Sequence, residues 1–145
     1  MTEMSFLKSD LVKLLYFLKE ARQIEGKTKF QKMVFLAQQE ENLNIGFEFI
    51  KYNYGPYSFD MTRGLEALEE IGLIDVTEKS YVDVNDKDNE LGKAFTFKLS
   101  DEGVRVIEQT QIDSHSKVII KKIISEWNPK SRAEIIKYVY SKYMN

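Results

Sequence analysis

The stretch from Lys27 to Ile74 constrains the fold of this chain more than any other part of it. Apolar side chains recur at helical spacing in residues 28–41 and again in residues 59–71, and an aromatic segment at 47–54 lies between them. Side chains three or four positions apart share one face of a helix, whereas a short aromatic-rich segment is typical of a strand. The stretch therefore predicts a helix, a strand, a tight turn and a second helix.

Polar residues mark the starts of both helices. Thr28 and Gln31 have the spacing of a capping box, in which each side chain accepts a backbone amide of the first turn. Glycine and proline at 55 and 56 end the predicted strand, and Ser58 follows as the expected N-cap of the second helix. The spacing assigns Lys29 and Lys32 to the solvent side. The predicted buried positions are Phe30, Met33, Val34, Ala37, Met61, Leu65 and Leu68.

The segments on either side complete the pattern. Residues 9–22 predict a first helix with Ser9 as N-cap, which ends before Gly26. Residues 74–84 and 93–99 predict a β-hairpin, and the polar residues 85–92 between them would form its loop, where a wing would lie.

Three further helices are predicted towards the C-terminus. Ser100 should cap one, residues 114–127 form the next, and Ser131 with Glu134 forms a capping box that opens the last. The order predicts an α+β, winged-helix-like domain with additional C-terminal helices. The 145 residues are expected to form a single domain, with a winged-helix-like core at 1–112 and a helical extension at 113–145.

Composition narrows the functions that such a chain could perform. The net charge is −2 at pH 7, so nucleic-acid binding would need a local basic patch. There is no cysteine, no cationic leader before an apolar run and no apolar run of membrane-spanning length, which favours a cytoplasmic protein that does not enter membranes.

Neither catalysis nor metal binding is indicated by the sequence. His115 is the only histidine, and the neighbouring Ser114 and Ser116 are better placed to cap a helix than to act as nucleophiles. Asp86, Asp88 and Glu90 alternate as at the start of a calcium loop, but the glycine and the bidentate glutamate of such a loop are missing. We therefore expect no enzyme activity, no cofactor and no metal.

Two motifs resemble the YwgA-like proteins of bacteria and archaea: residues 26–36 (GKTKFQKMVFL) and 54–58 (YGPYS), followed by residues 65–74. They are similar, more distantly, to the phage-associated Panacea-type antitoxin domain, which has a similar lysine–glutamine–lysine helix and Tyr-Gly-Pro turn. Residues 138–143 are also similar to the YwgA-like end, although methionine and asparagine replace the proline that usually follows. The resemblance implies a winged-helix-like fold and, for the Panacea relatives, neutralisation of a toxin protein; it brings no catalytic residues.

The predicted helix 59–71 is the element that would enter the major groove in a DNA-binding winged helix. Arg63 stands there against four acidic residues, and phosphates would be repelled. Only its start and the lysines of the preceding helix are usable. The candidate nucleic-acid contacts are Tyr57, Ser58, Thr62, Arg63, Lys27, Lys29 and Lys32. The alternative is structural: Tyr57 packs on the core, and Arg63 pairs with Glu66 or Glu70.

The C-terminal helices offer two further surfaces. Seven basic residues could receive phosphates or an acidic protein, or could form an ordinary solvated face. They are Lys117, Lys121, Lys122, Lys130, Arg132, Lys137 and Lys142. Trp127, Tyr138, Tyr140 and Tyr143 either pack on the first helix or form a partner or homodimer interface.

Two functions remain open at this point, and both are non-enzymatic. The first is a DNA-binding transcription regulator that contacts DNA through the start of helix 59–71, the lysines of helix 28–41 and the hairpin. The second is an antitoxin- or adaptor-type module that neutralises or delivers a partner protein.

Overall fold

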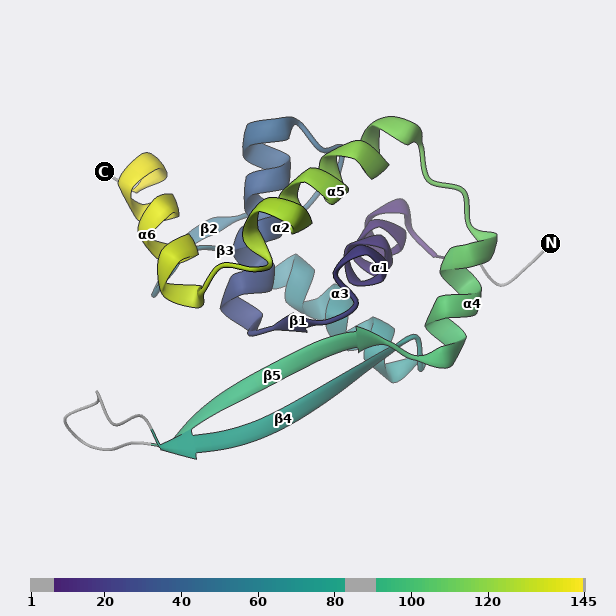
Figure 1. The fold of residues 1–145 in the computed structure, drawn as a ribbon, viewed down its shortest axis with the longest axis horizontal. Coiled ribbons are helices and arrows are strands. Elements are labelled where there is room, and N and C mark those ends of the chain that lie inside the picture. Colours follow the sequence, from purple (N-terminus) through teal and green to yellow (C-terminus); the bar gives the residue numbers. More distant parts are fainter. Residues whose placement is uncertain (1–6, 83–90, 145) are drawn as a thin grey trace.

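The computed structural model describes residues 7–82 and 91–144, and these form an α+β fold, as predicted (Figure 1). The elements in chain order are α1 (Ser9–Ala21), β1 (Ile24–Glu25), α2 (Lys27–Glu41), β2 (Ile50–Tyr52), β3 (Gly55–Tyr57), α3 (Phe59–Glu70), β4 (Ile74–Val82), β5 (Leu91–Leu99), α4 (Asp101–Gln109), α5 (Ser114–Trp127) and α6 (Arg132–Tyr143).

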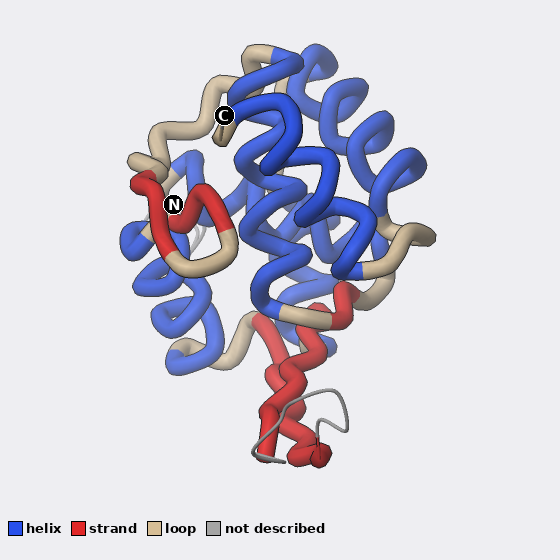
Figure 2. Tube along the Cα trace, turned by 90° about the vertical axis from the view of Figure 1, so that its left-hand side faces the viewer, coloured by secondary structure: helices blue, strands red, loops and turns tan. Residues whose placement is uncertain are grey.

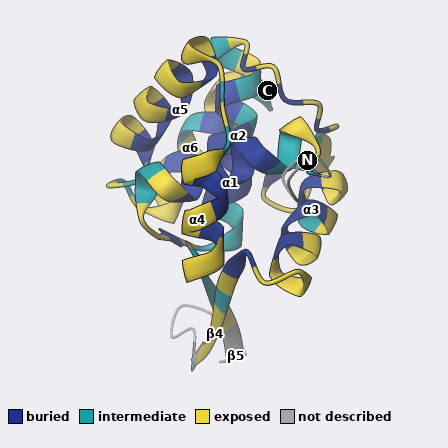
Figure 3. Cartoon of the chain, turned by 90° about the vertical axis from the view of Figure 1, so that its right-hand side faces the viewer, coloured by how far each residue is buried: buried dark blue, intermediate teal, exposed yellow. Residues whose placement is uncertain are grey.

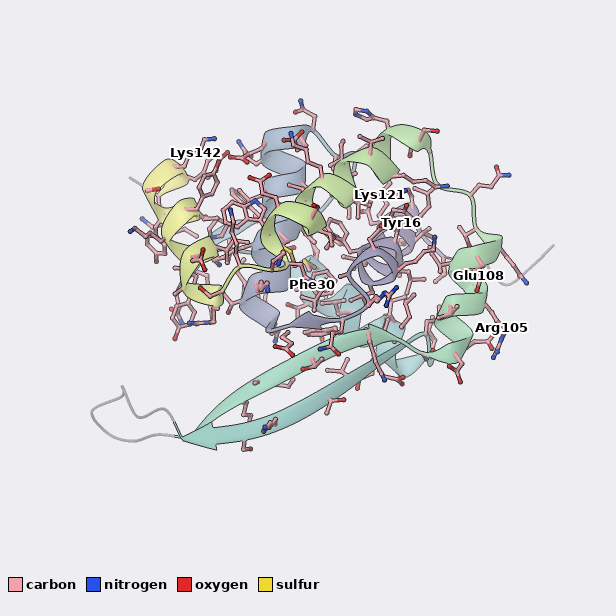
Figure 4. All side chains as sticks on the ribbon, in the orientation of Figure 1. Tyr16, Phe30, Arg105, Glu108, Lys121 and Lys142 are labelled. Carbon is pink, nitrogen blue, oxygen red and sulfur yellow. The ribbon has the colours of Figure 1, made fainter. Side chains whose placement is uncertain are left out.

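The core is built around α1 and α2, each of which carries more buried residues than any other element of the described chain (Figure 3). Phe30 of α2 lies at its centre, with its ring 5.5 Å from that of Phe97 and 6.2 Å from that of Phe17 (Figure 4). All seven positions predicted to be buried on α2 and α3 are buried. The helical spacing therefore identified the apolar faces of both helices correctly.

Two antiparallel strands form a long hairpin that projects from the helices (Figure 2). Ile74 pairs with Leu99 at its base, which confirms the hairpin predicted at 74–84 and 93–99. The two-residue strand β1 was not predicted; it pairs Ile24 with Phe97, so that the sheet order is β1-β5-β4. The predicted wing loop and its acidic residues at 86, 88 and 90 lie outside the described residues.

Three predicted helix caps are confirmed. The Ser58 hydroxyl accepts the Met61 amide at the start of α3, and the Ser100 hydroxyl accepts an amide of α4. Ser131 and Glu134 form both bonds of a capping box at the start of α6. At these positions the local pattern decides the structure, because each hydroxyl bonds an amide only three residues away.

Other predicted helix ends are wrong. Lys8, not Ser9, precedes α1 and makes no side-chain cap. The predicted capping box of Thr28 and Gln31 does not form, because α2 begins one residue earlier, after Gly26. The Gly26 amide donates to Phe95 of β5, so this glycine begins α2 instead of ending α1.

The strand predicted at 47–54 is shorter than expected and is half of a second hairpin. Ile50 pairs with Tyr57 and Tyr52 pairs with Gly55, so the chain turns at residues 53–54. The glycine and proline expected to end the strand lie inside β3. Proline is tolerated there because a two-stranded sheet consists of edge strands only.

The C-terminal helices cover α2. α5, which carries Trp127, packs on both α1 and α2, whereas the main contacts of α6 are with α2 and β3. The order α1, β1, α2, α3, β4, β5, with β1 beside β5, is compatible with a winged-helix-like core. That finer assignment stays a prediction.

Candidate functional site

Exposed apolar side chains gather where the β2–β3 hairpin meets the start of α3. Of the eight large hydrophobic residues that are exposed in the described part of the chain, five lie on or beside this hairpin: Ile50, Tyr52, Tyr54, Phe59 and Tyr140. Their exposed fractions run from 39% to 53%. We call Ile50, Tyr52, Tyr54, Tyr57 and Phe59 the aromatic patch.

The rings of the aromatic patch support one another. Tyr57 lies 5.3 Å from Tyr52 and 5.0 Å from Phe59, and Tyr52 lies 5.5 Å from Phe59, measured between ring centroids. Arg132 of α6 lies 4.6 Å from the centre of the Tyr54 ring. These are separations at which aromatic pairs and cation–π pairs attract, so the patch holds a defined shape while it stays open to solvent.

A buried glutamine fixes the patch to α2. The Gln31 side chain accepts the Ser58 amide at 2.9 Å and donates to the Ser58 carbonyl at 3.0 Å. It also donates to the Thr62 hydroxyl at 3.1 Å, and that hydroxyl lies 2.6 Å from the Tyr57 hydroxyl. Both Gln31 and Ser58 are fully buried. The glutamine that the sequence assigned to a capping box therefore joins α2 to α3.

Lys32 lies beneath the patch. It lines a hollow of about 210 Å³ between the start of α2 and the β2–β3 hairpin. Only 2% of the residue is exposed, and its ammonium group donates to the Pro56 carbonyl at 3.3 Å. Burial, together with the positive charge of Arg132, lowers the pKa of Lys32 from 10.5 to about 8. The expectation that Lys29 and Lys32 face solvent is therefore wrong.

Lys29 is buried on the side of α2 that faces α5. Its ammonium group donates to the Asn128 carbonyl, at the end of α5, and burial lowers its pKa. Both lysines are internal because α2 is contacted by α5, α6, β1 and β3, which leaves it little free surface.

The seven candidate nucleic-acid contacts do not form one surface. Lys29, Lys32 and Ser58 are buried, and the Thr62 hydroxyl is bonded within the protein. Arg63 is exposed, but it pairs with Asp60 and not with Glu66 or Glu70. Lys27 and Tyr57 are half-buried.

The aromatic residues at the C-terminus divide between core and surface. Trp127 is buried and its ring lies 4.8 Å from that of Tyr138. The hydroxyls of Tyr138 and Tyr143 both donate to the Glu40 carboxylate at 2.7 Å, and Lys142 donates to it at 2.8 Å. This cluster holds α6 against α2. Tyr140 alone points away from it, towards the Asn53 carbonyl.

The basic residues of α5 and α6 are partly neutralised. Lys122 pairs with Glu41 at 2.9 Å and Lys142 with Glu40, both at the end of α2. Lys130 lies 4.4 Å from the centre of the Trp127 ring. The surface is therefore less strongly cationic than its sequence indicates.

No catalytic geometry is seen around His115. Its side chain is exposed, and the neighbouring Ser116 hydroxyl donates to Asp113. Asp113, and not the serines predicted for this role, caps α5. Across residues 7–82 and 91–144 no cluster of three histidine or acidic side chains could hold a metal ion. No helix in the same ranges is long and apolar enough to cross a membrane.

Comparison with known proteins adds nothing to this picture: no family model, no curated protein and no solved structure matches the chain.

Proposed function

We propose that this chain is a non-enzymatic protein-binding module of the antitoxin or adaptor type, and that its partner docks on the aromatic patch. The observation that supports the proposal is the gathering of exposed aromatic side chains on a supported hairpin, beside Arg132. Aromatic residues and arginine are enriched in protein interfaces, and exposed apolar patches with polar rims mark interaction sites.

The electrostatics of α3 favour a protein partner over DNA. The exposed residues of this helix include Asp60, Glu66, Glu69 and Glu70, against which Arg63 is the single cation. DNA carries a dense negative charge that such a face repels, whereas a protein surface can present compensating cations.

Co-expression with the product of the adjacent gene tests the proposal. We expect a complex of fixed stoichiometry on size-exclusion chromatography. Phe59→Ala should weaken that complex at least tenfold, because it removes an exposed ring from the middle of the patch. Val118→Ala is the matched control: Val118 is 65% exposed on α5, far from the patch in sequence, and should leave affinity unchanged. A missing complex, or equal affinity for the Phe59 variant, would refute the proposal.

DNA binding is the competing proposal, and element order is its main support. Of its cationic candidate residues, Arg63 and Lys27 retain surface access. Fluorescence anisotropy with mixed-sequence duplexes at about 50 mM salt separates the two proposals, because non-specific binding is strongest at low salt. Salt-dependent binding that Arg63→Glu abolishes would favour DNA; no binding at tens of micromolar protein would eliminate it.

A further inference from the structure

The hollow above Lys32 combines positive charge with aromatic walls. The first two turns of α2 form one side, through Lys27, Thr28 and Lys32, and the β2–β3 hairpin with Phe59 forms the other. None of the described residues that line it is acidic. Its volume of about 210 Å³ is below the range of typical drug-sized ligand pockets, so it suits one small group and not a whole cofactor.

Among the described residues of the free chain, no anion compensates the charge of Lys32. Its ammonium group donates to a neutral carbonyl, that of Pro56, and the ion pairs of the described residues do not include it. A buried ammonium without a paired anion is costly, and buried charges in proteins are usually paired. The side chain nevertheless ends next to Gly55, where its Nζ would lie 3.7 Å from an added Cβ atom.

The start of α2 adds to the positive electrostatic potential in the hollow. Its N-cap is Gly26, which offers no side-chain acceptor, and its first turn contains no acidic residue. A helix N-terminus carries partial positive charge from unpaired amides and is normally compensated by a cap or an acid. Here Lys27 adds a further cation instead. The open helix end and the buried ammonium therefore border the same hollow.

We propose that the hollow binds one carboxylate group, carried by an acidic segment of the partner protein, and that this carboxylate pairs with the Lys32 ammonium. The aromatic walls would hold the flanking apolar atoms of the segment and exclude water. The assignment of the carboxylate to a partner protein rests on the proposed function, whereas anion binding in the hollow can be tested on the isolated chain.

The test follows the Cε and Hε signals of lysine by NMR at pH 7, with sodium acetate as probe and sodium chloride at matched ionic strength as reference. We expect a saturable shift at Lys32 and a linear, non-saturating response at Lys121, an exposed lysine on α5 (Figure 4). Lys32→Met removes the charge, and Lys32→Gln removes it while keeping a donor for Pro56. In the wild type the ring signals of Tyr52, Tyr54 and Tyr57, which line the hollow, should shift with the same saturation, and either folded variant should lose this change.

Each outcome bears on the proposal. A flat titration of the wild type, or tyrosine ring shifts that persist unchanged from the wild type in both Lys32 variants, overturns the anion site. Inorganic phosphate that binds at least tenfold more tightly than acetate would overturn the carboxylate assignment in favour of a phosphorylated partner. In the complex with the partner, Lys32→Met should weaken affinity at least tenfold. A flat titration with an intact complex refutes the site alone, whereas saturable acetate binding without any protein complex refutes the proposed function alone.

Discussion

Replacing Lys32 by methionine should make the protein more stable at neutral pH, although the substitution removes a hydrogen bond. Methionine has a similar length and no charge, so it can occupy the same space between α2 and β3. The folded chain holds this lysine at a pKa of about 8, against 10.5 as the ordinary value. Its charged form is therefore disfavoured by folding, and the cause is burial first and the charge of Arg132 second.

The size of the effect follows from linkage. Between pH 8 and 10.5 the unfolded chain holds a proton that the folded chain has released, so the wild type gains stability as pH rises through this window. One pKa unit corresponds to about 1.4 kcal/mol, and the two pKa values together give a gain of about 2.5 kcal/mol between pH 7 and pH 10. Loss of the donor to Pro56 offsets roughly 1 kcal/mol of the benefit that methionine brings at pH 7.

Urea unfolding of both proteins at several pH values measures this difference. Subtracting the two curves cancels the titration of all other groups that the substitution does not touch. The stability advantage of the Lys32→Met variant should be about 1–2 kcal/mol at pH 7 and should fall by about 2.5 kcal/mol by pH 10. A difference that does not change with pH would refute the assignment of Lys32 as a buried, uncompensated cation.

Three other predictions concern how the helices are held together. Glu40→Gln should lower the free energy of unfolding by about 1–3 kcal/mol at pH 7. Burial raises the pKa of Glu40, but hydrogen bonds from α6 outweigh this effect and lower the pKa overall. The stability lost in the variant should therefore shrink in urea melts below about pH 4.5, where the wild-type carboxylate becomes protonated. Gln31→Leu should cost about 1–3 kcal/mol, because the Ser58 amide is left buried without a partner, whereas the Ser58 carbonyl keeps its bonds from Thr62, and an unchanged melting curve would contradict this. Gly103→Ala should cost about 3 kcal/mol or more, because a Cβ there would lie 2.0 Å from the Leu73 carbonyl oxygen; a neutral result in thermal denaturation would be incompatible with this packing.

The sequence predicts those parts of the fold that depend on neighbours a few residues away. Ser58, Ser100 and Ser131 cap helices as expected, since a serine hydroxyl can reach the amide of the third residue in any helix that begins there. The buried faces of α2 and α3 follow from spacing alone.

Long-range contacts account for the features that the sequence did not predict. Gln31 has the local option of a capping box, yet its side chain bonds the backbone of Ser58, 27 residues away, and the Thr62 hydroxyl. Lys29 and Lys32 are charged, and charged residues are rarely buried unless paired. They are buried here because other elements surround α2. One feature of the sequence pointed to this burial. Lysines stand near the start of α2 and its first turn has no acidic residue, an arrangement that the helix dipole disfavours.

The candidate site was predicted only in part for the same reason. The motif around Gly55 and Pro56 lies in the right segment, but its pattern predicts the end of a strand and the entry to a DNA-reading helix. In the structure Gly55 has a φ of 104°, a conformation that side chains rarely adopt, and it allows the chain to turn back as β3. That second strand is what brings Tyr52 and Tyr57 together beneath Phe59 and creates a patch that no single helix would show.

The uncompensated charge of Lys32 links the stability of the free chain to the proposed binding step. At pH 8 about half of the molecules hold this lysine in the neutral form, because its pKa is about 8. A bound carboxylate favours the cation, so binding at pH 8 should draw in up to about half a proton per chain, and less at pH 7. The positive charge of Arg132, which lowers the pKa of Lys32, opposes this uptake. Titration calorimetry with acetate in two buffers of different ionisation enthalpy would detect the uptake at pH 8 as a buffer-dependent heat. Equal heats in both buffers would show that the anion does not pair with Lys32, and the cost of burying this lysine would then have no compensation in binding.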